Sequence, residues 1–264
     1  RENPGAKSYV QRLKLAQQTY LALSDADSSF WADARVDVRD AIIAYRRFGF
    51  ESSYPVLLAA FREWDKEKAS RLLIKLAKWS VRAQFDGKIG AGTSEEAFAS
   101  AAAGIASSKI KNQTEVRGIL TKLIPTDPEF RIAFTSYGKL TTHRAKYVLV
   151  MLEKAAELKD GKPERSLDWT STSVTIEHVL PQSKGNGDDD IEVKIQEIGN
   201  LALLEKKLNH QLGSKDFSER RDVYGESDYR LTQKLKHEDS WNVDTITART
   251  LKFADLACIA WPSD

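Results

Sequence analysis

The sequence contains one cysteine and one methionine, and each scarcity limits what the protein can be. Because Cys258 has no partner in the chain, no internal disulfide can form, which fits a reducing compartment and predicts a cytoplasmic protein. The lack of a cysteine pair also argues against a zinc site, since His210 and His237 have no partner at ligand spacing. Met151 lies deep inside the chain, so we expect position 1 not to be a translation start and the chain to be part of a longer protein.

The chain also lacks long apolar runs and a strong charge of either sign. No stretch reaches the apolar length needed to span a bilayer, and no signal peptide is visible, so no membrane partner is expected. The 40 Lys and Arg residues nearly balance the 38 Asp and Glu residues, so any nucleic-acid surface must be local. The hydrophobic content of 41% over 264 residues is enough for one large domain or two ordinary ones.

Helical periodicity dominates residues 1–160 and predicts a mainly α protein that opens with a helical bundle. Apolar residues recur at spacings of three and four, and breaks containing Gly or Pro separate the segments. The expected helices cover residues 9–23, 54–64, 67–85, 93–108, 114–124 and 140–158.

The character of the sequence changes in the last third, and we expect a second domain at residues 161–264. A polar stretch with Gly and Pro at 159–173 predicts a linker or a long loop. A short β-branched run follows it, then a polar loop with two glycines and three aspartates, then a second apolar run. Strands are expected at 173–180 and 199–204, and helices at 205–212, 216–224 and 241–261.

Four polar residues of this second domain form a candidate site. Glu177 and His178 lie together in the first expected strand, Asn200 heads the second, and Asn209 follows nine residues later in helical sequence. A hairpin folded against a helix would bring all four together. A neutral imidazole can take a proton from water, and carboxylate and amide oxygens suit a hard divalent ion that neutralises a phosphate. These are the groups needed for metal-assisted phosphodiester hydrolysis.

The segment EHVLPQS at 177–183, the segment GNLALL and the Asn-to-Asn spacing resemble the HNH, or ββα-metal, nuclease motif. The opening and the spacing look like the HNH domain of RNA-guided CRISPR nucleases. The wider sequence as far as residue 261 is similar to the C-terminal nuclease family of GmrSD-type restriction proteins. The resemblance implies a small ββα-metal nuclease domain buttressed by C-terminal helices. It also implies metal-dependent DNA cleavage by nicking, in a restriction system that acts in antiviral defence.

The same resemblance implies a partner and a role for each residue. Family members often carry an N-terminal nucleotide-hydrolysing domain, which would be missing here, and a phosphorothioate-sensing anti-phage protein has this two-part layout. By position, His178 is the general base and Asn200 holds the loop that orients it. Glu177 and Asn209 would hold Mg²⁺ or Mn²⁺. The acid is often Asp in this family, and the extra methylene of Glu could move the metal by roughly an ångström, which makes His210 a rival ligand.

Each of these residues also has an ordinary structural interpretation. A strand histidine is usually satisfied by its surroundings, an Asn before an apolar run is usually a turn residue, and the aspartates at 188–190 fit a solvated loop. The alternatives to an enzyme are a non-catalytic DNA-binding or partner-binding regulatory module and a purely helical interaction domain. The complete His-Asn-Asn set favours the enzyme, because a decayed module would be expected to lose one member.

Two groups of basic residues are candidates for contacts with DNA phosphates. One group follows a single face of the expected helix 67–85, where an anionic partner would relieve the repulsion between like charges. The alternative for this stripe is a solvated face with acidic neighbours on an adjacent helix. The other group lies close to the candidate site. The stripe is Lys68, Arg71, Lys75, Lys78 and Arg82, and the other group is Lys206, Lys207, Lys215, Arg220 and Arg221.

Overall fold

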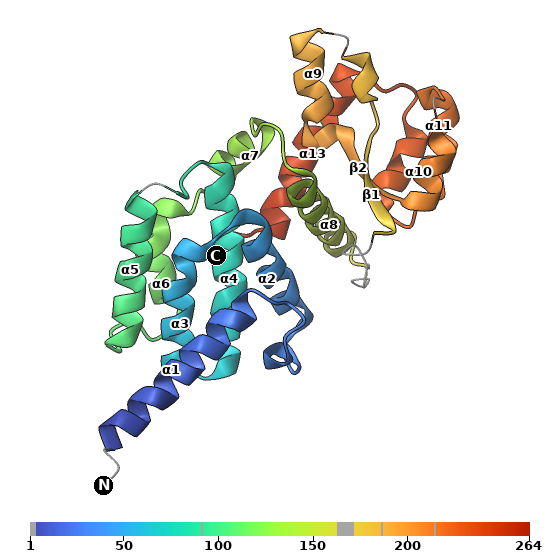
Figure 1. Ribbon diagram of the computed structural model, residues 1–264. Coiled ribbons are helices and arrows are strands. Elements are labelled where there is room, and N and C mark those ends of the chain that lie inside the picture. The colour runs from blue at the N-terminus through green and yellow to red at the C-terminus, as the bar shows by residue number, and fades with distance from the viewer. Residues whose placement is uncertain (1–3, 91, 163–171, 186, 214) are drawn as a thin grey trace. The chain divides into compact units, whose positions relative to one another are not determined.

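The computed structural model describes residues 4–90, 92–162, 172–185, 187–213 and 215–264. The chain is mainly helical with one two-stranded antiparallel sheet in the described part, which confirms the expected fold class. It divides into two compact units, Arg1–Thr126 with Trp261–Asp264, and Asp127–Ala260, which are coloured by residue number in Figure 1. Residues 127–160, which the sequence assigned to the helical domain, thus belong to the second unit.

The first unit is a bundle of helices whose ends follow local sequence signals. Pro55 lies in the first turn of α3, where its missing N–H costs nothing, and the Asp65 side chain caps α4 by accepting from Lys68 N. Gly49 ends α2 with a φ of 74°. The helices are α1 (Pro4–Leu23), α2 (Val36–Phe48), α3 (Tyr54–Glu63), α4 (Lys66–Phe85), α5 (Gly92–Ala106) and α6 (Gln113–Leu120).

The second unit is built around a hairpin of two short strands. The strand β1 (Val174–His178) pairs antiparallel with β2 (Leu201–Glu205), so that Glu177 lies opposite Ala202 and His178 opposite Leu201. Figure 1 shows α10 and α11 beside this hairpin. The helices are α7 (Asp127–Thr135), α8 (Thr142–Lys159), α9 (Asp189–Gln196), α10 (Lys206–Leu212), α11 (Phe217–Gly225), α12 (Arg230–Gln233) and α13 (Val243–Ala260).

Helix α8 explains why the second unit begins before the hairpin. The α8 helix packs on both strands and on α13. Its Glu153 side chain is only 1% exposed and accepts from the main-chain N–H groups of Arg230 and Leu231, at 2.6 and 2.9 Å, at the start of α12. A buried carboxylate with these donors is stabilised by the helix it caps. Most of the linker that the sequence predicts at 159–173, namely residues 163–171, lies outside the residues that the structure describes.

An apolar cluster between the hairpin and its helices holds the site together. The side chain of Trp241 stacks on Phe217, and the Tyr224 side chain is fully buried among their neighbours. The cluster consists of Val179, Ala202, Leu204, Leu212, Val223, Tyr224, Leu235, Trp241 and Ile246.

None of the helices in the described part of the chain is both long and apolar enough to cross a membrane.

Candidate active site

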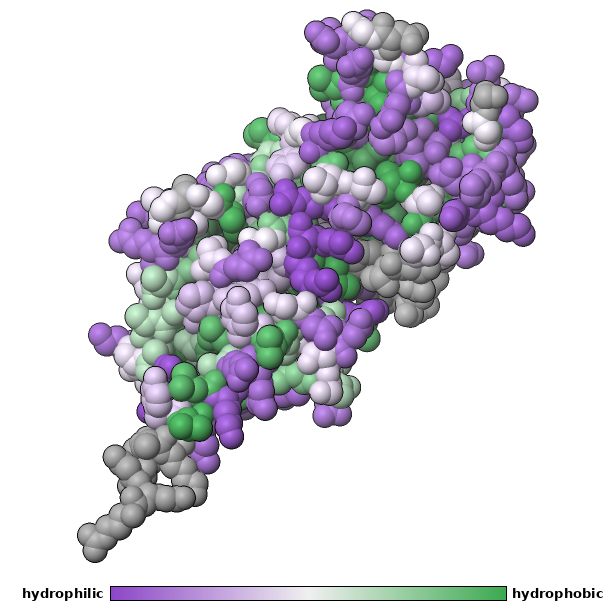
Figure 2. Space-filling model, viewed as in Figure 1, coloured by the Kyte–Doolittle hydropathy of each residue, from purple (hydrophilic) through white to green (hydrophobic). Residues whose placement is uncertain are grey.

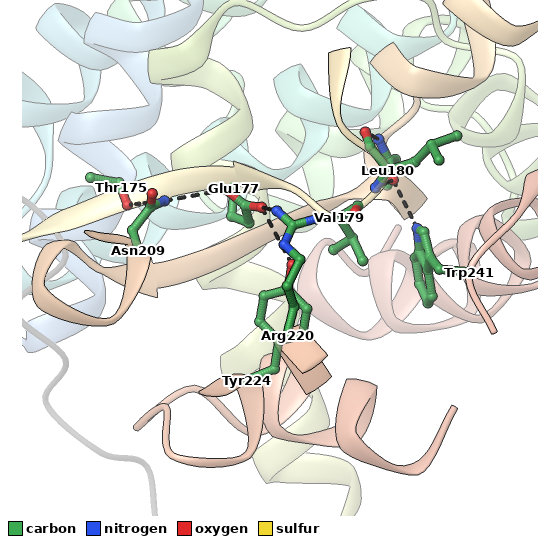
Figure 3. Close-up of polar contacts among 9 residues, drawn as sticks. Thr175, Glu177, Val179, Leu180, Asn209, Arg220, Tyr224 and Trp241 are labelled. Atoms are coloured by element: carbon green, nitrogen blue, oxygen red, sulfur yellow. Dashed lines mark hydrogen bonds and ion pairs between the residues drawn. The ribbon is translucent and has the colours of Figure 1, made fainter. Parts of the chain in front are cut away.

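The Glu177 carboxylate is the centre of a buried polar group between β1 and helices α10 and α11. Its Oε1 accepts from the Arg220 guanidinium and, at 3.3 Å, from the Tyr224 hydroxyl. Its Oε2 lies 3.3 Å from Nδ2 of Asn209, which also donates to Thr175 Oγ1 at 3.1 Å. Figure 3 shows Asn209 and Arg220 approaching Glu177 from different elements. The structure therefore brings together the two residues expected to bind a metal.

The surroundings of Glu177 act on its charge in opposite directions. Burial raises the pKa of the Glu177 carboxyl, whereas the Arg220 charge and the hydrogen bonds from Tyr224 and Asn209 lower it. The Tyr224 hydroxyl has a raised pKa, chiefly because it is buried and also because Glu177 is beside it. It therefore donates to the carboxylate as a neutral phenol.

Arg220 is not placed as the sequence predicted. We expected it to contact DNA phosphates, but it is 5% exposed and its guanidinium binds Glu177 and, at 2.9 Å, the carbonyl oxygen of Val179. An arginine with its donors committed inside the protein cannot also cover a phosphate on the surface. Arg220 therefore leaves the set of DNA-contacting candidates.

Glu177 and Asn209 offer chemistry that fits a divalent ion. Rotating the Asn209 amide would place its oxygen beside the carboxylate, and both oxygens are hard ligands of the kind Mg²⁺ and Mn²⁺ prefer. No group of three or more His, Cys, Asp or Glu gathers within the described residues, so the ion would keep several waters. The adjacent Arg220 neutralises the carboxylate and lowers the affinity of such a site. His210, the rival ligand, is exposed on α10.

His178 occupies the end of β1 and faces away from this polar group, because successive strand residues point to opposite sides. The His178 Nε2 atom lies 3.3 Å from Gln182 Nε2. Burial lowers the pKa of the imidazole, a hydrogen bond with Gln196 raises it, and the charge of Lys139 lowers it. The net direction is downward, so the ring is neutral at neutral pH. No hydrogen bond between described residues joins His178 to Glu177 or Asn209.

Asn200 is fully buried and holds the loop that follows His178. Its Oδ1 accepts from Leu180 N at 2.7 Å and from Trp241 Nε1 at 2.9 Å. Its Nδ2 donates to the carbonyl oxygens of Leu180 at 3.0 Å and Ile195 at 2.9 Å. All of its polar groups are thus used, which is the arrangement that a loop-holding role requires. Of the aspartates at 188–190, Asp188 caps α9, and the other two lie in the first turn of that helix.

The remaining basic residues of the group near the site are more exposed than Arg220. Lys206, Lys207 and Lys215 are exposed, and Figure 2 shows hydrophilic side chains gathered over α10 and α11. Arg221 is half-buried, 3.4 Å from the Glu238 carbonyl oxygen and 3.9 Å from an Asp239 carboxylate oxygen. The three lysines remain the best placed of this group for phosphate contacts.

The stripe on α4 is less open than its spacing suggested. Arg82 is fully buried and donates to the carbonyl oxygens of Pro125 at 3.0 Å and Trp261 at 2.8 Å, so it is a structural residue and not a DNA contact. Arg71 pairs with Glu67 one turn earlier. Lys68 lies 5.0 Å from the centre of the Trp64 ring.

Lys75 and Lys78 complete the stripe and are half-buried. Burial lowers the pKa of Lys78, and the charge of Lys75 acts in the same direction. Arg71 is thus the only exposed member of the stripe, and its charge is already paired.

A match to a known family indicates the type of function that the chain serves. Residues 124–256, just over half of the chain, match the C-terminal domain of GmrSD restriction endonucleases. The chain belongs to this family. Membership of the GmrSD C-terminal family indicates a restriction-endonuclease type of function with DNA as substrate, as the sequence resemblance implied. No curated protein matches the chain, so the resemblance to a phosphorothioate-sensing anti-phage protein stays a prediction.

Sequence reasoning missed several residues of this site. Arg220 and Tyr224 stand one helical turn apart, a spacing that places both on one face of α11. That signal is visible in the sequence, but it does not say which face is buried. Gln182 lies in the motif segment EHVLPQS but was given no role there, and Gln196 beside His178 and Trp241 beside Asn200 carry no local signal.

Proposed function

We propose that this GmrSD-family chain is a metal-dependent DNA endonuclease of the HNH type that nicks one strand per visit. The observation that carries the proposal is the contact between Glu177 of β1 and Asn209, 32 residues apart in the chain, next to the half-buried His178 that ends the same strand. A carboxylate and an amide in contact, one residue from a neutral imidazole, are what hydrolysis of a phosphodiester requires.

His178 acts as the general base in this proposal. Its lowered pKa keeps the imidazole unprotonated at neutral pH, so it can take a proton from the attacking water. Gln182 and Gln196 hold the ring, and Asn200 fixes the loop behind it. Glu177 and Asn209 would hold Mg²⁺ or Mn²⁺, which neutralises phosphate charge when bound.

The placement of these groups limits how DNA approaches. Because Glu177 and His178 face opposite sides of β1, the scissile phosphate is proposed to lie at the end of the strand, where the chain turns away after His178. Lys206, Lys207 and Lys215 lie exposed on and after α10 and would contact flanking phosphates. A single set of such groups cuts one strand per visit, which favours nicking.

The wider biological setting is also a proposal. We infer that the chain restricts foreign DNA in antiviral defence, in the cytoplasm, together with a nucleotide-hydrolysing domain N-terminal to it. In this proposal the nucleotide-hydrolysing domain controls when the nuclease cuts. Such control is needed because uncontrolled metal-dependent cleavage would damage any DNA within reach.

The test is incubation of supercoiled plasmid with Mg²⁺ or Mn²⁺, scoring open-circle against linear product. The wild-type chain should give open circles, EDTA should stop the reaction, and His178→Ala should abolish it while keeping the folded circular dichroism spectrum. His143→Ala is the matched control, since His143 is exposed on α8. Wild-type nicking by folded His178→Ala protein, or full activity in EDTA, would contradict the proposal.

A second candidate is a DNA-binding module that does not cut. The ion pair between Arg220 and Glu177 supports it, because the guanidinium already occupies one oxygen of the carboxylate that Asn209 contacts. The plasmid assay separates the two functions. DNA binding without cleavage in either metal supports the module, and His178-dependent nicking supports the enzyme.

A further inference from the structure

We infer that Arg220 is a positioning residue of the active site, which brackets His178 by binding the residues on both sides of it. This inference rests on the proposed function and assigns a role to a residue outside the HNH motif. One guanidinium nitrogen pairs with the Glu177 carboxylate and another donates to the Val179 carbonyl oxygen at 2.9 Å. His178 is therefore held between two anchored neighbours.

The bracket continues into the loop that follows. Val179 N donates to the Asn200 carbonyl oxygen at 3.0 Å, and Leu180 N donates to Asn200 Oδ1 at 2.7 Å. Arg220 and Asn200 together thus fix residues 177, 179 and 180. Arg220 and Asn200 thus hold the main chain directly after His178, and Arg220 also holds the side chain directly before it, so both contribute to the direction of the imidazole.

An arginine is needed for this geometry. Its planar fork presents two N–H groups to two acceptors at once, whereas a lysine ammonium is a single point charge. Nη1 makes the contact with Val179 and Nη2 the contact with Glu177, so both ends of the fork are used.

The helix that carries Arg220 is itself fixed. Asp216 and Glu219 form a reciprocal capping box at the start of α11. Phe217 stacks on Trp241 with ring centroids 5.6 Å apart, and Trp241 donates to Asn200. The helix α11 therefore links the two holders of the His178 segment.

The test compares Arg220→Met and Arg220→Lys with Val223→Ala in the full chain. Val223 is buried on the same helix and contributes to the same apolar cluster, so Val223→Ala lowers stability without removing the bracket. All variants are assayed well below their melting temperatures. We expect Arg220→Met to lower kcat by roughly a hundredfold with KM for DNA unchanged, because small misplacements of a catalytic group cost about that much. Arg220→Lys should recover only a small part.

Two kinetic outcomes would overturn the inference. If Arg220 contacts phosphate, Arg220→Met raises KM and reduces the salt dependence of DNA binding by about one unit. If Arg220 only stabilises the fold, Val223→Ala should lose as much activity as Arg220→Met when the two variants lose the same stability.

Hydrogen exchange measured by mass spectrometry gives a readout that does not depend on cleavage. The peptide with Val179 and Leu180 should exchange faster in Arg220→Met than in the wild type and Val223→Ala. Unchanged exchange contradicts the inference. A wild-type chain that does not cut DNA contradicts the proposed function instead. The exchange result then tests on its own whether Arg220 holds the segment around His178.

Discussion

At the scale of single residues, the half-buried imidazole of His178 predicts how activity depends on pH. Because burial and the Lys139 charge lower the pKa of His178, the acid limb of kcat/KM should lie below that of an exposed histidine. Gln196→Ala removes a hydrogen bond that raises this pKa, so it should move the limb lower still. Rates measured between about pH 5 and 8 test this, and a midpoint above that of free histidine would contradict it.

The same shift has a consequence for stability. A lowered folded-state pKa means that the unfolded chain binds the proton more readily. The contribution of His178 to stability is therefore present above its unfolded pKa and is lost as the pH falls through the folded pKa. The His178→Ala variant should lack this part of the acid sensitivity.

Also at the residue scale, the pair between Glu177 and Arg220 predicts non-additive losses. The two side chains are 12% and 6% exposed, so Glu177→Ala leaves a buried guanidinium without its partner. We expect about 3 kcal/mol of lost stability, the usual cost of breaking a buried pair. Adding Arg220→Met should restore part of it. Urea unfolding of both single variants and the double variant measures the coupling, and additive losses would contradict the expectation.

At the scale of elements, the start of β2 depends on close contact with α13. A Cβ at Gly199 would meet the main-chain oxygen of Ile246 and lie 2.8 Å from Thr250 N, and neither atom can move without shifting the helix. Gly199→Ala should therefore lower the melting temperature of the second unit and weaken cleavage. Gly118→Ala is the control, because nothing lies within 4 Å of its Cβ position in α6 and the same substitution should stabilise by about 0.5–1 kcal/mol.

At the scale of the whole molecule, the division into units predicts which fragments fold. The fragment 127–260 keeps α8, whose Glu153 accepts from the start of α12 and whose Lys146 donates to Val174 O in β1. It should fold and nick DNA. The fragment 161–264 lacks these contacts and exposes one face of the hairpin, so it should be unfolded by circular dichroism. A folded, active 161–264 fragment would contradict the assignment of α8 to this unit.

The distribution of charge over the molecule predicts where DNA binds. Lys206→Glu with Lys207→Glu should weaken binding to all sequences and reduce the salt dependence by about two units, one for each lost phosphate contact. Arg71→Glu with Lys75→Glu should change both the binding and its salt dependence less, because Arg71 is already paired and Lys75 is half-buried. DNA titrations at two salt concentrations compare them. A larger effect on the α4 stripe would return that helix to the DNA-binding surface.

Local pattern was enough to predict the hairpin and the helices around it. The strands expected at 173–180 and 199–204 are observed at Val174–His178 and Leu201–Glu205, and Asn209 lies on the expected helix. Helices α2, α7 and α9 were not singled out. In α2, Val38, Ala41, Ile42, Tyr45 and Phe48 follow a helical spacing, so this helix was open to prediction, whereas α7 and α9 have only nine and eight residues, too few for a clear period.

What the sequence could not show are the contacts between distant segments. The pairing of Arg220 with Glu177 spans 43 residues, and the burial of Arg82 depends on carbonyl groups up to 179 residues away. Both arginines were expected at the surface, because charged residues are rarely buried unless paired. The boundary near residue 126 was missed for the same reason, since Glu153 meets its partners 77 and 78 residues later.

The hydrogen bond from Trp241 to Asn200 gives the protein its own spectroscopic reporter. The chain has six tryptophans, and each contributes one indole N–H resonance to a nitrogen–proton correlation spectrum. The Trp241 proton bonds at 2.9 Å to the oxygen that also holds Leu180 N, two residues after the proposed base. Its resonance therefore senses whether that turn of the backbone is ordered, and it can be followed during a metal or DNA titration without labelling the site itself.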